Sequence, residues 1–210
     1  MSSTLEADAR LALVAVGQSG AFTRSQALGA GFRPAQVERR VRTGGWERVH
    51  PRVYRYGATP MSVALVHWAA VLWAGPECAL SHTSAAAIWR LPVAPLDRPE
   101  LIVPKARAPR VTGVVVHRVA RIDARDVLQP HGLPVTSPVR TLIDLAGVLA
   151  ADDLEMVLMH ARSRGLVTVR ALGVHLAEIG TAGRPGTARL RTLLAAIGSA
   201  PGEPSARMAG

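Results

Sequence analysis

The 210-residue sequence has only one cysteine, Cys78, and only one lysine, Lys105. A single cysteine excludes the disulfide framework on which many small secreted proteins depend. It also excludes zinc sites built on several cysteines, and the seven histidines are scattered without zinc-type spacing. We therefore expect a protein of the reducing cytoplasm, without a bound metal or cofactor.

Long hydrophobic runs are also lacking. The most apolar stretch, residues 63–74, has 12 residues and includes His67, whereas a helix that spans a bilayer needs about 20. Residues 1–10 contain Glu6 and Asp8, which do not fit the basic start of a secretory signal. We expect no membrane partner and a buried helix at residues 63–74.

Charged residues are scarce, at 19% of the sequence, and aromatic residues scarcer, at 4%. Apolar residues make up 49%, and the mean hydropathy is +0.19. This composition excludes a disordered chain. The length suits one domain or two small ones, with a hydrophobic core that needs no covalent cross-link.

Several catalytic motifs are missing. A restriction-type nuclease needs an acidic residue followed by Glu-x-Lys to hold a divalent metal, but Val103 and Pro104 precede the single lysine. A nucleotidyltransferase needs a Gly-Ser turn followed by paired carboxylates, and the only Gly-Ser lies at residues 198–199. Neither a Walker loop nor a dinucleotide-binding glycine motif occurs. We therefore predict that the protein is not an enzyme.

A serine–histidine catalytic set is the remaining enzymatic possibility. It would combine His82 and Ser84 with an orienting acid such as Asp144. We favour a simpler interpretation, in which Ser81 is the N-cap of the helix that follows it. His117, on a predicted strand, is interpreted as a packed or surface residue.

Positive charge is in excess and unevenly distributed. The 25 basic and 15 acidic residues give a formal net charge of +10, and all the basic residues except Lys105 are arginines. Residues 1–60 carry +5 and residues 97–125 carry +4, whereas residues 61–96 are neutral and residues 126–210 carry +1. Basic blocks attract polyanions over long distances, and nucleic acid is the commonest polyanion of the cytosol.

The first sixty residues show the element order of a winged helix-turn-helix domain. Hydrophobic periodicity and capping signals predict helices at 5–16, 24–30 and 35–43 and a hairpin with strands at 46–49 and 53–56. Thr23 is a suitable N-cap, and Pro34 stands in the first turn of the third helix. In such domains the third helix enters the major groove of DNA, and the hairpin reaches the backbone or the minor groove.

The third predicted helix has an apolar face and a basic face. Val37 and Val41 share the apolar face, and Arg39 lies opposite them with Gln36 beside it. We predict that Gln36 and Arg39 read base edges. The predicted contacts to DNA phosphates are Arg24, Arg40, Arg42, Arg48, Arg52 and Arg55. The alternative is a protein-interaction module, in which the winged helix does not bind DNA and its arginines are only solvated.

The rest of the chain is predicted to form a mixed α/β domain, residues 61–198, and a flexible tail, residues 199–210. Predicted helices cover 63–74, 83–89, 138–149, 152–164, 168–179 and 186–197, and predicted strands cover 100–103 and 114–119. With the winged helix at residues 1–60, the expected fold class is α+β, with a small sheet and several helices in the second domain.

Seven short segments are specific enough to compare with known families. In the first domain they are GAFTRSQA at 20–27, QVERRVR at 36–42, GWERV at 45–49 and VYR at 53–55. In the second domain they are LSHTSAAAIW at 80–89, VHR at 116–118 and HGLPVTSPVRTLIDLA at 131–146. Together they resemble the AbiEi-type antitoxins of abortive-infection (type IV) toxin–antitoxin systems. The resemblance covers residues 5–197.

This resemblance implies that the winged helix binds the promoter of its own operon and represses it. It also implies that the second domain opposes a nucleotidyltransferase toxin without a lasting contact. Many actinobacterial relatives continue into a restriction-endonuclease-like domain, whereas residues 198–205 here are rich in Gly, Pro and Ser. We therefore expect double-stranded DNA as a partner, a functional link to the toxin, and no nuclease activity.

Overall fold

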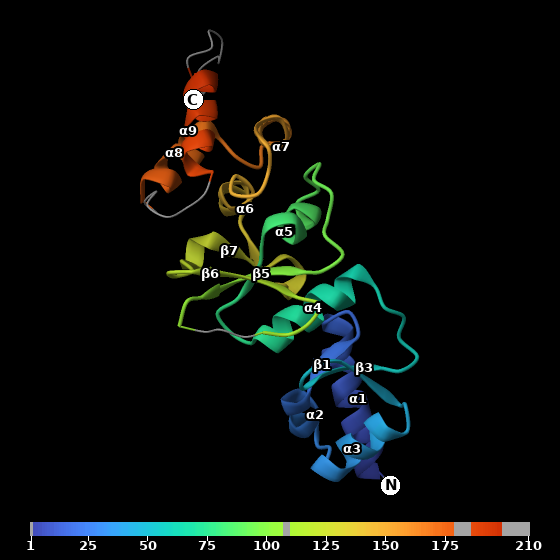
Figure 1. Ribbon diagram of the computed structural model, residues 1–210. Coiled ribbons are helices and arrows are strands. Elements are labelled where there is room, and N and C mark those ends of the chain that lie inside the picture. The colour runs from blue at the N-terminus through green and yellow to red at the C-terminus, as the bar shows by residue number, and fades with distance from the viewer. Residues whose placement is uncertain (1, 107–109, 179–185, 199–210) are drawn as a thin grey trace, which may run out of the picture.

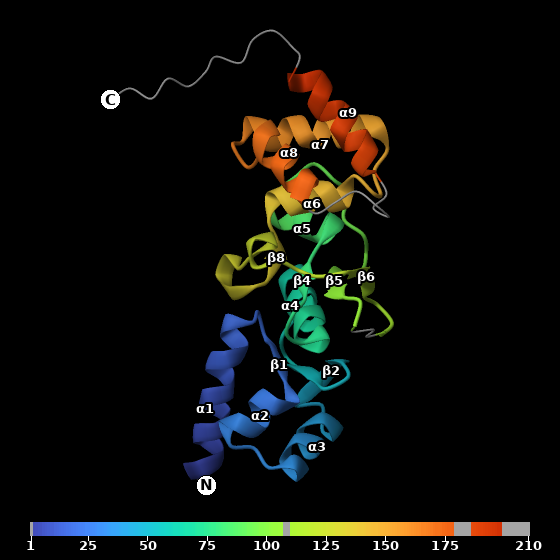
Figure 2. The same ribbon diagram turned by 90° about the vertical axis from the view of Figure 1, so that its left-hand side faces the viewer.

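A computed structural model describes residues 2–106, 110–178 and 186–198. The described part is elongated, with a small domain at the N-terminal end, a mixed sheet in the middle and a group of helices at the other end (Figures 1 and 2). The α+β fold class predicted from the sequence is confirmed. The predicted tail at 199–210 lies outside the described residues.

The N-terminal domain is a winged helix. Its elements are α1 (Ser2–Gly17), β1 (Ala21–Thr23), α2 (Arg24–Ala30), α3 (Pro34–Arg42), β2 (Trp46–His50) and β3 (Val53–Tyr56). The three strands form an antiparallel sheet in the order β1-β3-β2. The predicted helices and hairpin are therefore present, and β1 is an additional short strand that pairs with β3, the second strand of the hairpin.

Local capping explains the two short helices of this domain. Thr23 and Gln26 form a capping box at the start of α2, and Gly31 ends that helix in a left-handed conformation with φ 111°. Pro34 begins α3, where its missing N–H is not needed. Both helices pack on fully buried Trp46, whose ring centroid lies 4.9 Å from those of Phe22 and Phe32.

Helix α4 (Val63–Ala74) connects the winged helix to the rest of the protein. Its residues Leu65 and Ala69 pack on Ala21 and Val53 of the winged-helix sheet. Its other side packs, through Ala70 and Ala74, against the second sheet. Residues 63–74 thus form the buried helix expected from the sequence. Among the described residues, no helix combines the length and the apolar character that crossing a bilayer requires.

The second sheet is mixed and has five strands. They are β4 (Ala79–Leu80), β5 (Glu100–Pro104), β6 (Val115–Val119), β7 (Val127–Leu128) and β8 (Val135–Thr136). Their order is β6-β5-β4-β8-β7, with β5 and β6 parallel and β4 and β5 antiparallel. The sequence predicts only β5 and β6, because the other three strands have two residues each.

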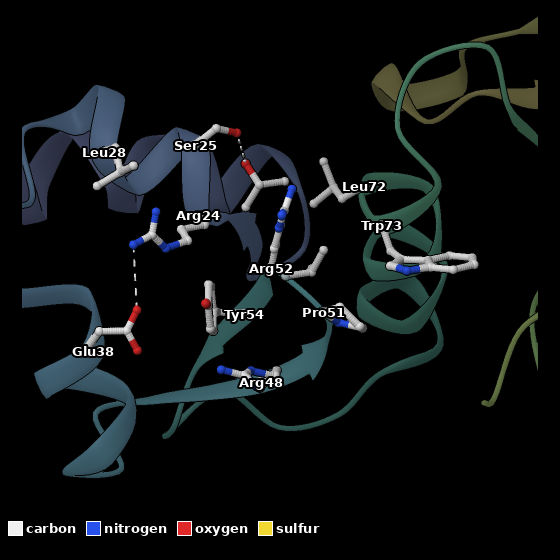
Figure 3. A pocket seen from close by; sticks show the side chains of 12 residues that line it. Arg24, Ser25, Leu28, Glu38, Arg48, Pro51, Arg52, Tyr54, Leu72 and Trp73 are labelled. Carbon is white, nitrogen blue, oxygen red and sulfur yellow. Dashed lines mark hydrogen bonds and ion pairs between the residues drawn. The ribbon is translucent and has the colours of Figure 1, made fainter. Parts of the chain in front are cut away.

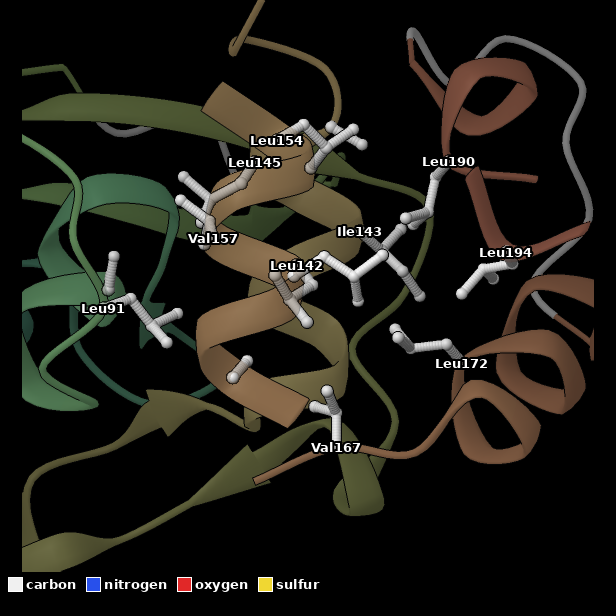
Figure 4. Packing of buried hydrophobic residues seen from close by; sticks show 14 of the residues in the cluster. Leu91, Leu142, Ile143, Leu145, Leu154, Val157, Val167, Leu172, Leu190 and Leu194 are labelled. Carbon is white, nitrogen blue, oxygen red and sulfur yellow. The ribbon is translucent and has the colours of Figure 1, made fainter. Parts of the chain in front are cut away.

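In the described part of the chain, two helices lie on the side of this sheet opposite α4, and three more pack over them (Figure 2). They are α5 (His82–Ile88), α6 (Pro138–Leu145), α7 (Ala151–Ser163), α8 (Val169–Glu178) and α9 (Thr187–Gly198). Leu142 of α6 lies in the middle of their core, with Leu154, Leu172 and Leu190 of the other helices around it (Figure 4). Short 3-10 turns, η1 (Ala124–Asp126) and η2 (Pro130–Gly132), lead from β6 to β8.

A buried ion cluster fixes α6 to the neighbouring elements. The Arg140 guanidinium, 1% exposed, lies 2.7 Å from Asp126 of η1 and 2.9 Å from Asp144 of its own helix. Burial alone would lower the pKa of Arg140, but Asp144 and Asp126 outweigh it and raise that pKa. Asp126 also lies 2.9 Å from His175 of α8. Each charge in this cluster therefore has an opposite charge beside it, with one guanidinium between two carboxylates.

Asp126→Ala is expected to lower the free energy of unfolding by about 3–5 kcal/mol, because it removes one of the two carboxylates bound to the buried Arg140 guanidinium and leaves Nη1 without that hydrogen-bond acceptor. Asp123→Ala is the matched control, since it removes an aspartate whose partner Arg121 is 77% exposed. We expect the control to cost less than about 1 kcal/mol. Urea unfolding followed by circular dichroism measures both values, and equal losses would contradict a structural role for the buried cluster.

Candidate functional site

Helix α3 presents a basic surface to solvent, as its sequence predicts. Val37 on its inner side is fully buried in the winged-helix core. Arg39 and Arg42 are exposed. Because these two residues are three positions apart, they lie on neighbouring parts of the outer face of the helix.

The β2–β3 hairpin carries two further exposed arginines. Arg48 stands on β2, next to a register shift between Arg48 and His50. Arg52 lies at the tip in a left-handed conformation, with φ 65°, and its carbonyl oxygen accepts a hydrogen bond from the Arg24 N–H at 2.8 Å. This bond connects the tip of the wing to the beginning of α2.

An open cavity of about 760 Å³ lies between α2, α3, the hairpin and α4 (Figure 3). Arg24, Arg48 and Arg52 line it, together with a single acidic residue, Glu38. Arg24 lies 3.6 Å from Glu38 in an ion pair that is partly exposed. The lining thus has two more positive than negative charges, which suits an anionic ligand.

Besides Arg24, two more of the predicted phosphate contacts have partners within the chain. Arg40 lies 2.6 Å from Asp8 of α1, and its guanidinium stands over the rings of Phe32 and Trp46, 5.7 and 6.0 Å from their centroids. A DNA phosphate would have to replace the Asp8 carboxylate at this position. The Arg40 side chain therefore contributes to the packing of α1 on α3.

Arg55 has a similar structural position. Its side chain is only 14% exposed and forms an ion pair with Glu47 of the neighbouring strand. It also donates hydrogen bonds to the carbonyl oxygens of Gly57 and Thr59. These contacts hold the loop after the hairpin, and they engage the donors that a phosphate would need.

Gln36 caps the helix on which it lies. Its Oε1 atom accepts a hydrogen bond from the Arg33 N–H at 2.7 Å. A bidentate contact with adenine needs both the oxygen and the nitrogen of the amide, so the cap competes with the predicted base contact. The signal was available in the sequence, because a helix that begins at Pro34 has Gln36 at the third position, where capping glutamines occur.

A second group of titratable side chains lies at the central sheet and the beginning of α5. His82, Glu100 and His117 come from α5, β5 and β6, and one ligand atom of each lies within 4.8 Å of the others. The two imidazole rings are stacked with their centroids 3.6 Å apart, and His117 Nε2 lies 2.9 Å from Glu100 Oε1. Sequence spacing alone did not reveal this cluster, because the three residues belong to different elements.

The environment keeps the His82 ring neutral and the Glu100 carboxylate charged. Burial, followed by the neighbouring charge of His117, lowers the pKa of His82 to about 4. The pKa of Glu100 is also lowered: burial alone would raise it, but hydrogen bonds from His117 and Thr83 outweigh that effect. At neutral pH the cluster therefore offers an uncharged imidazole next to an anionic carboxylate.

The predicted cap by Ser81 is wrong in its detail. Ser81 occupies the N-cap position of α5, but its side chain makes no capping hydrogen bond. Its Oγ atom instead pairs with His82 Nδ1 at 3.0 Å. The serine–histidine catalytic set is not assembled either, because Ser84 Oγ accepts a hydrogen bond from the Glu100 N–H and Asp144 pairs with Arg140.

Comparison with known proteins adds a structural likeness. No family model matches the sequence, and no curated protein matches it. The crystal structure of the RV2827C protein from Mycobacterium tuberculosis is similar to this chain with a TM-score of 0.57 and 19% sequence identity. The similarity covers 90% of this chain and 76% of the mycobacterial one. At this low sequence identity, the likeness shows that the two proteins share a fold.

Substitutions of the adjacent residues Arg40 and Arg39 distinguish an arginine that packs against the core from one that only adds surface charge. The quantity compared is the loss of unfolding free energy. Arg40→Ala removes the Asp8 ion pair and the contact with the aromatic rings, and we expect it to cost about 1–2 kcal/mol of unfolding free energy. Arg39→Ala changes an exposed side chain and is expected to cost less than about 0.5 kcal/mol. Urea denaturation compares the two; an Arg40→Ala protein as stable as Arg39→Ala would remove the structural role of Arg40.

Proposed function

We propose that this protein binds double-stranded DNA and represses transcription from its own promoter, as the antitoxin of a type IV system directed against a nucleotidyltransferase toxin. The observation that carries the DNA-binding part is the set of four exposed arginines on α3 and the hairpin. Within the described part of the chain, Arg39, Arg42, Arg48 and Arg52 form no ion pair. Their charges are thus available to a polyanion.

The arrangement of these arginines fits the way in which winged helices dock on DNA. Helix α3 supplies Arg39 and Arg42 to the major groove, which is wide enough for a helix. The hairpin supplies Arg48 and Arg52 to the backbone beside it. We assign Arg39 to base recognition, because a guanidinium can pair with both acceptors of a guanine edge, and the hairpin arginines to phosphate contacts.

Arg39→Ala is expected to weaken binding to the cognate operator by about 1–3 kcal/mol and binding to random duplex very little. Arg52→Ala is expected to weaken both and to reduce the magnitude of the slope of log K against log salt by about 0.9, because one phosphate contact is lost. Fluorescence anisotropy with labelled duplexes over a salt series measures both effects. The upstream intergenic fragment supplies the cognate sequence.

The control for both variants is Arg191→Ala, which removes an exposed arginine from α9 at the far end of the molecule. It should leave both affinities unchanged. Equal losses by Arg39→Ala on cognate and random duplex would refute the base contact. Wild-type protein that does not retard the upstream fragment at low ionic strength would refute DNA binding altogether.

The antitoxin role rests on the seven segments that resemble the AbiEi-type family. It predicts a nucleotidyltransferase gene beside the gene of this protein. Co-expression of the two should restore growth that the nucleotidyltransferase alone stops. We expect the Arg39→Ala protein to restore growth as well when both genes are driven by foreign promoters, because repression and neutralisation then depend on different domains. Failure of the wild-type protein to restore growth would refute the antitoxin role without affecting DNA binding.

A second candidate function, protein–protein interaction, is favoured by the outer face of α1. Leu5, Leu13 and Val16 are 72%, 77% and 79% exposed, and their helical spacing places them on one side. Exposed apolar side chains that gather on one face are typical of a contact surface. This function would replace the first if the wild-type protein fails to bind DNA.

A further inference from the structure

The fold brings three metal-ligating side chains to the β6 edge of the central sheet. Strands β5 and β6 run parallel and place Glu100 and His117 on adjacent strands. The Ser81 N–H donates a hydrogen bond to the Glu100 carbonyl oxygen at 2.9 Å, which sets the beginning of α5, with His82, beside them. The convergence therefore follows from the backbone topology and does not depend on a long flexible side chain.

Two of the three potential ligands, Glu100 and His82, are oriented by further hydrogen bonds. The Thr83 backbone N–H and hydroxyl both donate to Glu100 Oε2, at 2.9 and 2.5 Å, so that Oε1 faces His117. Ser81 Oγ pairs with His82 Nδ1, which leaves Nε2 of that ring as a donor atom. Outer partners of this kind hold metal ligands in orientation and fix the tautomer of a histidine.

We propose that His82, Glu100 and His117 form a binding site for one divalent transition-metal ion of the Zn²⁺ type. Two imidazoles and a carboxylate are a donor set that such ions prefer. Ligand atoms about 2.1 Å from one tetrahedral ion lie about 3.4 Å apart. The atoms here lie within 4.8 Å of one another, so the most distant pair must approach by at most about 1.4 Å, and the two stacked rings must turn so that both nitrogen lone pairs point at the ion.

The burial of the three residues also fits such a site. His82 and Glu100 are 7% and 3% exposed, whereas the His117 side chain is 29% exposed. The cluster is thus accessible from the His117 side. Three protein ligands leave one position of a tetrahedral ion for water, which is the coordination of catalytic zinc sites and not of closed structural ones.

The backbone of His82 is strained, as is that of five other non-glycine residues in the described part of the chain. It lies in the left-handed region, with φ 48°, which is unfavourable for a residue with a β-carbon. Strained residues persist where the surroundings hold them in place, and they are concentrated at functional sites. Here the strained position turns the imidazole onto the ring of His117.

Isothermal titration calorimetry of the EDTA-treated full chain with ZnCl2 tests the site. We expect one equivalent of Zn²⁺ to bind, and His117→Gln and Glu100→Gln each to weaken that binding at least about 100-fold. Ser81→Ala, which removes only the partner of the His82 ring, is expected to weaken it about 10-fold. His131→Gln changes an exposed histidine outside the cluster and should leave the affinity unchanged.

Absorption spectra with CoCl2 provide a second readout. Visible bands of a bound cobalt ion should appear with the wild type and His131→Gln and be lost with His117→Gln. His117 is the deciding position, because its partial exposure makes it the ligand whose replacement disturbs the fold least; circular dichroism checks each variant. No Zn²⁺ binding by the wild type, or binding unaffected by His117→Gln and Glu100→Gln, would overturn the proposal and leave a structural histidine–glutamate pair only. The result is independent of DNA binding.

Discussion

The burial of helix α4 on two sides is the constraint on which the rest of the structure depends. One side packs on the winged-helix sheet through Leu65 and Ala69, and the other packs on the central sheet through Ala70 and Ala74. Alanine at three of these positions lets the sheets approach the helix closely. Because water is excluded from both sides, separating the two parts would expose apolar surface at a cost of about 25 cal/mol per Å². The boundary predicted at residue 60 thus stands next to a helix that both parts share.

Periodicity and capping signals were sufficient to predict the larger elements. Pro34 in the first turn and the stop at Gly44 and Gly45 predict helix α3, and two β-prone runs around residues 50–52 predict the hairpin. The two-residue strands β4, β7 and β8 could not be predicted, because such strands exist only through pairing with distant segments. Leu80, for example, pairs with Val135 across most of the second domain. The sequence of neither segment indicates that the two strands pair.

In the candidate sites, too, some features follow from local sequence, and others depend on contacts between residues that are far apart in the sequence. The exposed face of α3, with Arg39 and Arg42, follows from helical geometry alone. The engagement of Arg40 by Asp8 does not, because the two residues are 32 positions apart. Glu100 and His117 are 17 positions apart and meet through strand pairing. Composition therefore shows that the chain is basic, whereas the fold decides which arginines hold the protein together and which face solvent.

The elongated arrangement of the chain has a consequence for simultaneous binding. Helix α3 and the C-terminal helices α7–α9 lie at opposite ends of the described structure, with α4 and the central sheet between them (Figures 1 and 2). If α3 inserts into a duplex, the helical end projects away from the double helix into solvent. A bound duplex would then leave that end sterically accessible, so a macromolecule could contact the C-terminal helices without first displacing the protein from the DNA.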